Sequence, residues 1–230
     1  MDRQETLDFL NANAETYTFL SQMLFKELNE EAIAALAASE WPQDTGNERL
    51  DHGYYLLRRY FAFSNASERR RQLAVEYARI FLAAGVFQSK KSTAVPYESV
   101  FVGEERLVMG EARDAVVRWF AEDGFAVDPD LHEPEDHIAF ELEYLATMST
   151  RAASLLEEND AEAFVGNLRR QVRFIDEHLL NWVAQLRGCA ADFAKTTFYI
   201  GMLEVAEGAL QQSRALLVAI GTQAQAELSA

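Results

Sequence analysis

The amino-acid sequence predicts an all-α protein, a bundle of roughly eight to twelve helices. Only 4 of its 230 residues are proline and 11 are glycine, so few residues interrupt long helices. Apolar residues recur at three- and four-residue steps, and no segment sustains the period of two that marks a half-buried strand. Hydrophobic residues make up 49% of the chain, which is typical of globular proteins. We expect residues 1–230 to form a single domain.

The first two expected helices lie close to the N-terminus. In residues 4–28, apolar side chains fall three or four positions apart, which predicts one long amphipathic helix. The Ala-rich segment 30–39 predicts a short second helix. Trp41-Pro42 should end this helix, because the residue before a proline avoids the helical region.

The next two expected helices carry aromatic side chains on one face. Residues 47–63 place Tyr54 and Phe61 on the same face as two leucines. Ser67 has the position of an N-cap, and the helix after it has an apolar stripe at four-residue spacing: Leu73, Tyr77 and Phe81. Residues 82–98 lack a period and are expected to form a long loop, which in a compact domain is usually functional or disordered.

Two further helices are expected around a run of acidic residues. Residues 110–121 form the first of them. Pro134 should begin the second, because the first turn of a helix does not need the missing N–H. The acidic side chains around this proline suit the positive end of a helix dipole, and the helix should run to about Glu158.

The last two expected helices complete the bundle. Asp160 caps the first of them, which carries apolar residues through Leu179. The second runs from about 191 to 222. Ser99–Met109 is the only segment whose pattern fits neither helix nor strand clearly.

The charge of the chain limits its partners. Lys and Arg number 21 and Asp and Glu 37, a net charge of −16. Such a charge argues against nucleic-acid binding, which depends on Lys and Arg, and favours a cationic partner. The alternative is that the acidity only keeps the protein soluble. Because the chain lacks a secretory signal and a long apolar run, we expect a cytoplasmic protein without an integral membrane segment.

The sequence contains none of the usual catalytic or cofactor motifs. It lacks a dinucleotide fingerprint, a P-loop, a His-Glu-x-x-His pair and a Gly-x-Ser-x-Gly elbow. The single cysteine, Cys189, excludes an internal disulfide and a cysteine-based metal cluster within one chain. A di-iron bundle would need Glu-x-x-His pairs, which are missing. We therefore expect no enzymatic activity, no metal and no cofactor.

Two groups of residues are candidates for a binding site. Between Glu122 and Glu143 there are nine acidic residues and no Lys or Arg. Within this run His137 and Glu141 are four apart and share a helix face; the alternative is a capped helix with a solvated acidic face. The second group is the aromatic stripe of Tyr77 with the loop that follows it, although a stripe at helical spacing is more often core.

Three motifs stand out along the chain: Tyr77-Ala-Arg-Ile80-Phe81, Pro96-Tyr-Glu98-Ser99-Val-Phe101 and Glu133-Pro134-Glu-Asp136-His137-Ile-Ala-Phe-Glu141. Together they resemble those of the TorD/DmsD/NarJ family, cytoplasmic chaperones of molybdenum-containing redox enzymes. The most specific motif resembles the family's Glu-Pro-x-Asp-His-x-x-x-Glu-Leu signature, although Met148 falls three places later than in the family and Leu145 takes its place. The region after it agrees more loosely, in Phe174-Ile175, His178, Trp182 and Phe198-Tyr199.

The resemblance implies a function in enzyme maturation. Members bind the twin-arginine signal peptide of a client oxidoreductase, the apoenzyme, or both, while the molybdenum cofactor is inserted and before export. They are all-helical, and monomers or domain-swapped homodimers. Signal-peptide or client binding is then expected at Asp136, His137, Glu141, Tyr77, Ile80, Phe81, Pro96, Glu98, Ser99 and Phe101. The alternative is a scaffold that binds only the mature client and does not recognise the signal peptide.

Overall fold

The protein is all-α over residues 1–82, 94–103 and 107–229, which the computed structural model describes. Besides three short segments, η1 (Ala66–Glu68), η2 (Pro129–Leu131) and η3 (Ile175–Leu179), ten α-helices lie within these ranges. They are α1 (Arg3–Phe25), α2 (Glu30–Ala38), α3 (Glu48–Phe63), α4 (Arg69–Phe81), α5 (Glu98–Val102), α6 (Glu111–Asp123), α7 (Ile138–Glu157), α8 (Ala161–Phe174), α9 (Val183–Phe193) and α10 (Phe198–Leu228).

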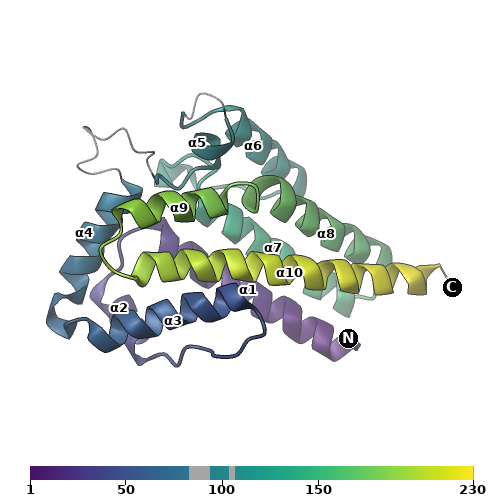
Figure 1. Ribbon diagram of the computed structural model, residues 1–230. Coiled ribbons are helices and arrows are strands. Elements are labelled where there is room, and N and C mark those ends of the chain that lie inside the picture. The colour runs from purple at the N-terminus through teal and green to yellow at the C-terminus, as the bar shows by residue number, and fades with distance from the viewer. Residues whose placement is uncertain (83–93, 104–106, 230) are drawn as a thin grey trace.

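The long helix α10 organises the bundle. It runs the length of the molecule, with α3 on one side and α8 and α9 on the other, while α1 packs against α7 behind it (Figure 1). Helices α3 and α10 approach so closely that a Cβ atom on Gly53 would lie 2.7 Å from Val205, and one on Gly208 would lie 2.8 Å from the backbone of Leu50. Glycine at these positions therefore allows the two helices to touch.

Most of the predicted helices are confirmed, and one predicted cap is wrong. Asp160 caps α8 as expected, because its carboxylate accepts a hydrogen bond from the Ala163 N–H. Ser67 is not an N-cap. It lies inside the short segment η1, and Asn65 accepts the hydrogen bond from its N–H. Asn and Ser side chains both accept hydrogen bonds from N–H groups a few residues ahead. The local sequence therefore does not show which of Asn65 and Ser67 is the cap.

The expected helix start at Pro134 is also wrong. Residues 134–137 form a turn in which the His137 N–H donates to the Pro134 carbonyl at 3.2 Å. His137 itself is the N-cap of α7, and the helix begins at Ile138. Proline followed by acidic residues fits a helix start equally well, so local sequence does not separate the two alternatives.

The C-terminal third differs from the prediction in two ways. The predicted helix through Leu179 ends as an α-helix at Phe174 and continues as a π-helical turn, η3. The predicted helix over 191–222 is two helices, since α9 ends at Phe193 and α10 begins at Phe198.

The segment around α5 settles part of the ambiguous region. Most of the loop expected over 82–98, namely 83–93, lies outside the described residues, as does 104–106. Within the ambiguous segment Ser99–Met109, residues 99–102 belong to the short helix α5, and 103 and 107–109 are not helical. None of the helices described above is both long enough and apolar enough to cross a membrane.

Candidate functional site

Two segments that are distant in sequence, 96–99 and 136–138, pair backbone to backbone. Two hydrogen bonds of 2.9 Å join them, one in each direction. Tyr97 and His137 face each other as an isolated antiparallel bridge. Two of the motifs that the sequence singled out therefore lie at one place, beside the N-terminal end of α7.

The side chain of Asp136 strengthens this junction. Its carboxylate accepts a hydrogen bond of 2.8 Å from the N–H of Ser99, in the first turn of α5. Tyr97, the N-cap of this helix, makes no side-chain hydrogen bond to the N–H groups of the helix. Asp136 therefore caps α5 from a different part of the chain. Burial raises the pKa of Asp136, while the hydrogen bonds from Ser99 oppose the shift.

His137 is a neutral cap inside an aromatic enclosure. Its Nδ1 accepts a hydrogen bond of 3.1 Å from the Ala139 N–H, so the ring proton lies on Nε2. Its ring packs against Tyr97, Phe25 and Phe140, with centroids 5.2 to 5.7 Å away. Burial in these surroundings lowers the pKa of His137 to about 3. The imidazole is thus uncharged at neutral pH.

Glu98 links α5 to the π-helical turn. Its carboxyl group lies 3.0 Å from Nδ1 of His178 and accepts a hydrogen bond of 3.2 Å from Asn181. Burial raises the pKa of Glu98, although the bonds to His178 and Asn181 act in the opposite direction. A π-helical turn inside an α-helical stretch is common at functional sites.

Glu141 completes a set of three buried carboxyl groups, Glu98, Asp136 and Glu141, which we call the carboxyl cluster. Glu141 is fully buried, and neither of its side-chain oxygens has a hydrogen-bond partner among the described residues. Burial and then the charges of Glu98 and Asp136 raise its pKa well above the ordinary value. An ionised carboxylate without a cation would be strongly destabilising here, so burial favours the protonated form of Glu141.

The predicted aromatic stripe lies nearby, in the core. Tyr77, Ile80 and Phe81 are at most 3% exposed. The Tyr77 hydroxyl donates to the carbonyl of Phe25 at 2.6 Å, and the Tyr77 and Phe81 rings pack on Tyr199. Phe25 is the link to the carboxyl cluster, because its ring also packs on His137. The stripe is therefore part of the core and packs beneath the candidate site through Phe25.

The accessible side of the carboxyl cluster is aromatic and acidic. Phe101 is half-buried and stacks on Trp182 at 5.4 Å. Tyr97 is half-buried as well, and its hydroxyl donates to the exposed carboxylate of Glu133 at 2.5 Å. Val102, at the end of α5, is exposed. Apart from Trp182, these side chains lie on the segments that carry Glu98 and Asp136, and each is at least partly exposed.

Four residues of this site were not predicted from the sequence as site residues: Phe25, His178, Asn181 and Trp182. The four-residue spacing of His178 and Trp182 could have placed them together, and the indole of Trp182 does donate to the His178 carbonyl at 2.6 Å. The contacts of His178 and Asn181 with Glu98 join residues 80 and 83 positions apart, so no local pattern reveals them. Pro96, by contrast, is buried at the backbone pairing, as part of its predicted motif.

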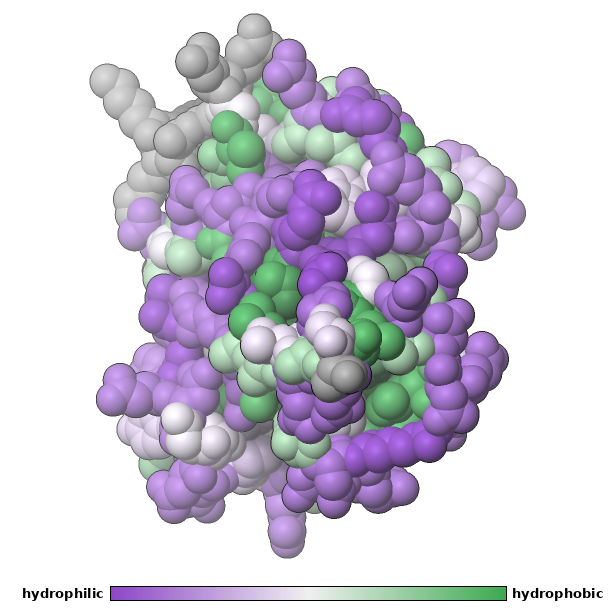
Figure 2. Space-filling view, turned by 90° about the vertical axis from the view of Figure 1, so that its right-hand side faces the viewer, coloured by the Kyte–Doolittle hydropathy of each residue, from purple (hydrophilic) through white to green (hydrophobic). Residues whose placement is uncertain are grey.

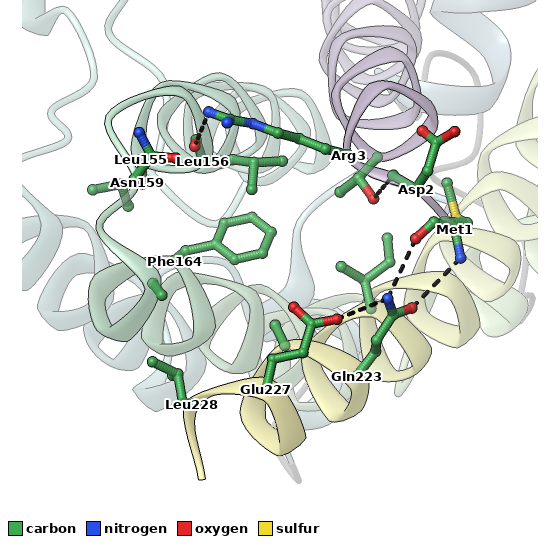
Figure 3. Close-up of a pocket in the computed structure, with 14 residues that line it drawn as sticks. Met1, Asp2, Arg3, Leu155, Leu156, Asn159, Phe164, Gln223, Glu227 and Leu228 are labelled. Atoms are coloured by element: carbon green, nitrogen blue, oxygen red, sulfur yellow. Dashed lines mark hydrogen bonds between the residues drawn. The ribbon is translucent and has the colours of Figure 1, made fainter. Parts of the chain in front are cut away.

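A separate pocket lies at the other end of α7. It has a volume of about 500 Å³ and lies between the ends of α1, α7, α8 and α10 (Figure 3). Apolar side chains gather on this face of the molecule (Figure 2), and Leu155, Phe164 and Ile220 line the pocket. Leu155 follows Glu141 by 14 residues on α7 (155 − 141), which places the pocket about 20 Å from the carboxyl cluster. None of the predicted site residues lines it.

In the part of the chain that the structure describes, no group of three His, Cys, Asp or Glu side chains could hold a metal ion. The carboxyl cluster therefore offers acidic oxygens without a metal-binding geometry. The expectation that the protein works without a metal or cofactor stays a prediction.

Comparison with known proteins identifies the family. Residues 43–187 match the family model described as nitrate reductase delta subunit. A protein of Photobacterium profundum named chaperone protein TorD is 30% identical, over 87% of this chain and 93% of its own length. The TorD chaperones of Vibrio cholerae (91% of this chain, 94% of theirs) and Vibrio parahaemolyticus (88% and 93%) are 28% and 27% identical. The chain therefore belongs to the nitrate reductase delta subunit family, as the resemblance of its motifs to TorD, DmsD and NarJ predicted.

Proposed function

We propose that this protein is a cytoplasmic chaperone that binds the twin-arginine signal peptide of a molybdenum-containing oxidoreductase at the carboxyl cluster. Membership of the family and the chaperone names of its relatives support the general role. The observation that carries the choice of site is Glu141, whose two buried oxygens are unpartnered beside Glu98 and Asp136.

The chemistry of the carboxyl cluster suits a guanidinium group. The hydrogen-bond partners of the three carboxyl groups are one histidine, His178, and a few N–H groups. The cluster therefore has more hydrogen-bond acceptors than donors. An arginine side chain offers five donors in a planar fork and remains charged at any physiological pH. Pairing with it would satisfy the free oxygens of Glu141 and allow this residue to ionise. The acidic surface around Glu133 would attract the peptide beforehand.

The path to the carboxyl cluster passes α5. This helix has only five residues and is attached at its N-terminal end through the Asp136 cap and the pairing with 136–138. In the proposed complex α5 shifts outward, the arginines pair with the carboxyl cluster, and the apolar centre of the signal peptide packs on Phe101 and Val102. A twin-arginine signal peptide has a cationic start followed by an apolar centre. This order matches the carboxyl cluster followed by the apolar side chains of Phe101 and Val102.

Such binding explains how a chaperone would delay export. A signal peptide held at this site is unavailable to the export machinery while the client remains apo. Cofactor insertion can then precede release. The protein supplies binding and timing in this account, and no chemical step.

The test uses conservative variants and a synthetic signal peptide. Asp136→Asn and Glu98→Gln keep the shape of each side chain and remove its charge. Titration calorimetry with a peptide that carries two consecutive arginines before an apolar segment should show at least about tenfold weaker binding to each variant, or 1.4 kcal/mol. The control is a peptide with glutamines in place of the arginines. It should bind the wild-type protein as weakly as the arginine peptide binds the variants.

Asp176→Asn provides the matched control variant, because Asp176 is a carboxylate paired with Arg214 on the far side of the π-helical turn. It should leave peptide affinity unchanged. If both cluster variants bind the arginine peptide as tightly as the wild-type protein does, the peptide site is not the carboxyl cluster.

A further inference from the structure

The C-terminal half of α10 presents a helix face without charge. Residues 215–226 form the longest uncharged run of the sequence, in which 25% of all residues are charged. They lie where α10 extends toward its C-terminus at one end of the molecule (Figure 1). We call the exposed side chains of this run the neutral face: Ala215, Val218, Ala219, Thr222, Gln223 and Ala226. A lack of charged residues distinguishes the centre of a protein interface from ordinary surface.

Two hollows of about 500 Å³ lie beside the neutral face, one on each side of α10. The first is the pocket at the end of α7, whose lining includes Phe164 and Ile220 (Figure 3). The second lies between α8 and α10, and its lining includes Val172 and Leu217. Val218 also borders the second hollow and is 43% exposed. A ridge of side chains between two grooves is the shape with which helices pack on one another.

The two hollows carry opposite charges at their borders. Arg169 and Arg173 border the second hollow, and Arg169 donates a hydrogen bond of 2.8 Å to Gln225. Glu227 borders the first hollow. It accepts a hydrogen bond of 3.1 Å from Gln223 and has no ion pair among the described residues. Since a helix rises about 1.5 Å per residue, Gln225 and Glu227 differ by only about 3 Å in height along α10.

Most other charged side chains at these borders are engaged within the chain. Asp2 caps α1, because its carboxylate accepts a hydrogen bond of 2.8 Å from an N–H of the first turn. Arg3 donates to two carbonyl groups at the end of α7, at 2.8 and 3.1 Å. Arg173 pairs with the glutamate four residues later. Glu227 and Arg169 therefore remain as the available pair of opposite charges.

We infer that the neutral face joins two copies of this chain. Each copy carries a net charge of −16, so two copies repel each other except where the facing surfaces are uncharged or of opposite sign. At physiological ionic strength, charges more than about 8 Å from the interface are largely screened. The neutral face meets the first condition, and its two borders meet the second. One chain supplies both Glu227 and Arg169, so the surface is complementary to itself, as an isologous dimer requires.

The charges also fix the orientation of the two copies. A two-fold axis along α10 makes the two helices parallel and brings the first hollow of each copy against the second hollow of the other, so that Glu227 faces Arg169. An axis perpendicular to α10, in the plane of the interface, would instead place Glu227 near its own equivalent. The alternating four- and three-residue spacing of a coiled-coil seam occurs on the neutral face, at Ala215, Ala219, Thr222 and Ala226. Parallel packing along this seam agrees with the placement of the charges.

The interface is small, which limits its affinity. From 215 to 228 α10 is about 20 Å long, and with a hollow on each side the surface is about 20 Å wide, or about 400 Å² per copy. Stable complexes bury about 1,200–2,000 Å² in total, so roughly 800 Å² predicts a reversible dimer with a dissociation constant of roughly tens to hundreds of micromolar.

This dimer differs from the domain-swapped homodimers that the family resemblance implies, because neither copy exchanges a helix. The carboxyl cluster of each copy stays outside the interface, about 20 Å away along α7. The inference therefore does not rest on the proposed function, and its failure would leave the peptide site untouched.

Sedimentation equilibrium of the full chain at physiological ionic strength, up to millimolar concentration, measures the dimer. Val218→Glu places a charge on the neutral face and should weaken dimerisation at least about tenfold, or 1.4 kcal/mol. Val75→Glu is the matched control, because Val75 is 51% exposed on α4, at the opposite end of the molecule (Figure 1). It makes the same change of residue and charge and should leave the dimer unchanged. Circular dichroism and the thermal midpoint establish that each variant folds.

A charge swap tests the orientation of the two copies. Glu227→Arg brings two cations face to face at each border and should weaken the dimer about threefold to tenfold. Arg169→Glu brings two acids together and should have an effect of similar size. The double variant restores opposite charges, so its dissociation constant should return to within about threefold of the wild-type value.

The other results would each overturn the inference. A chain that stays monomeric over the whole concentration range would leave the neutral face to a different partner. A wild-type dimer that Val218→Glu does not weaken would place the contact on another face. If Val218→Glu weakens the dimer but the double charge variant does not restore it after the single ones, the parallel arrangement is wrong.

Discussion

Two sets of buried carboxyl groups in this protein differ in whether cationic side chains pair with them. On α10, Glu204 and Glu207 are buried and are met by Arg49 and Arg187, with contacts of 2.6 to 3.3 Å. In the carboxyl cluster, Glu141 has no cationic partner within the described part of the chain, and its polar neighbours are Glu98, Asp136 and Trp182. The first group is matched charge for charge and ties α3 and α9 to α10. The second is short of cations.

This difference separates a structural site from a candidate binding site. Removing either partner of a buried ion pair destabilises the protein, because the other charge is left buried and unpaired. An unmatched carboxyl group instead shifts its pKa and stays protonated, and such groups concentrate at functional sites. The comparison predicts that variants of the two groups will respond in opposite directions.

The largest expected effect is on the matched group. Replacing both Arg49 and Arg187 with methionine leaves two buried carboxylates unpaired, and should lower the free energy of unfolding by about 2 to 3 kcal/mol, less than for a fully buried pair because both arginines are partly exposed. Urea denaturation at pH 7 measures the change. Adding Glu204→Gln and Glu207→Gln should restore at least half of the loss; no recovery would mean that the arginines act by packing alone.

A smaller effect is expected from His137 in acid. Its folded-state pKa of about 3 lies below the unfolded value of 6.5, so its neutral form contributes stability above pH 6.5 that is lost as the pH falls toward 3. His137→Asn keeps a good N-cap but does not titrate. Between pH 7 and pH 5 the wild-type protein should lose about 1 to 2 kcal/mol more than this variant. Parallel stability curves over that range would contradict the buried, neutral imidazole.

The contribution of Glu141 to stability should change with pH in the opposite direction to that of His137. Its raised pKa means that the folded state holds a proton that the unfolded chain releases, so stability falls as the pH rises above the unfolded pKa of 4.5. Glu141→Gln removes this fall. The variant and the wild-type protein should be about equally stable near pH 4, and the variant should be more stable at pH 7 by on the order of 1 kcal/mol or more. A variant that is markedly less stable at pH 7 would show that Glu141 is ionised and paired.

The smallest expected effect concerns the approach of the ligand. Glu133 is exposed, so Glu133→Gln should slow the association of the arginine peptide only about twofold to threefold at low salt, with little change in dissociation. Stopped-flow fluorescence at low and physiological ionic strength measures both rates. An equal effect at both salt concentrations would argue against steering by this surface.

The sequence predicts the helices well and their junctions less well. Periodic apolar spacing in α1, α3 and α7 reflects burial of one face, which is a local property and can be read locally. The end of α9 and the start of α10 are separated by residues 194–197, which contain no proline or glycine, so nothing in the local pattern marks the break.

The motifs of the candidate site could be predicted from the sequence, but their arrangement could not, and their role in binding stays a prediction. The Asp-His pair and the Pro-Tyr-Glu-Ser segment do lie together, whereas the misplaced start at Pro134 hid the role of His137 as the cap of α7. Contacts such as Glu98 with His178 join residues 80 positions apart. Burial of the carboxyl cluster depends on several helices at once, and a pattern within one helix does not reveal it.

Proton release on peptide binding tests the central claim most directly. If an arginine of the signal peptide pairs with the carboxyl cluster, Glu141 must give up its proton. Calorimetry at pH 7 in buffers with different ionisation enthalpies should then show release of about one proton per bound peptide for the wild-type protein and none for Glu141→Gln. Tight binding to the wild-type protein with no proton released would contradict the claim that the carboxyl cluster receives the arginine.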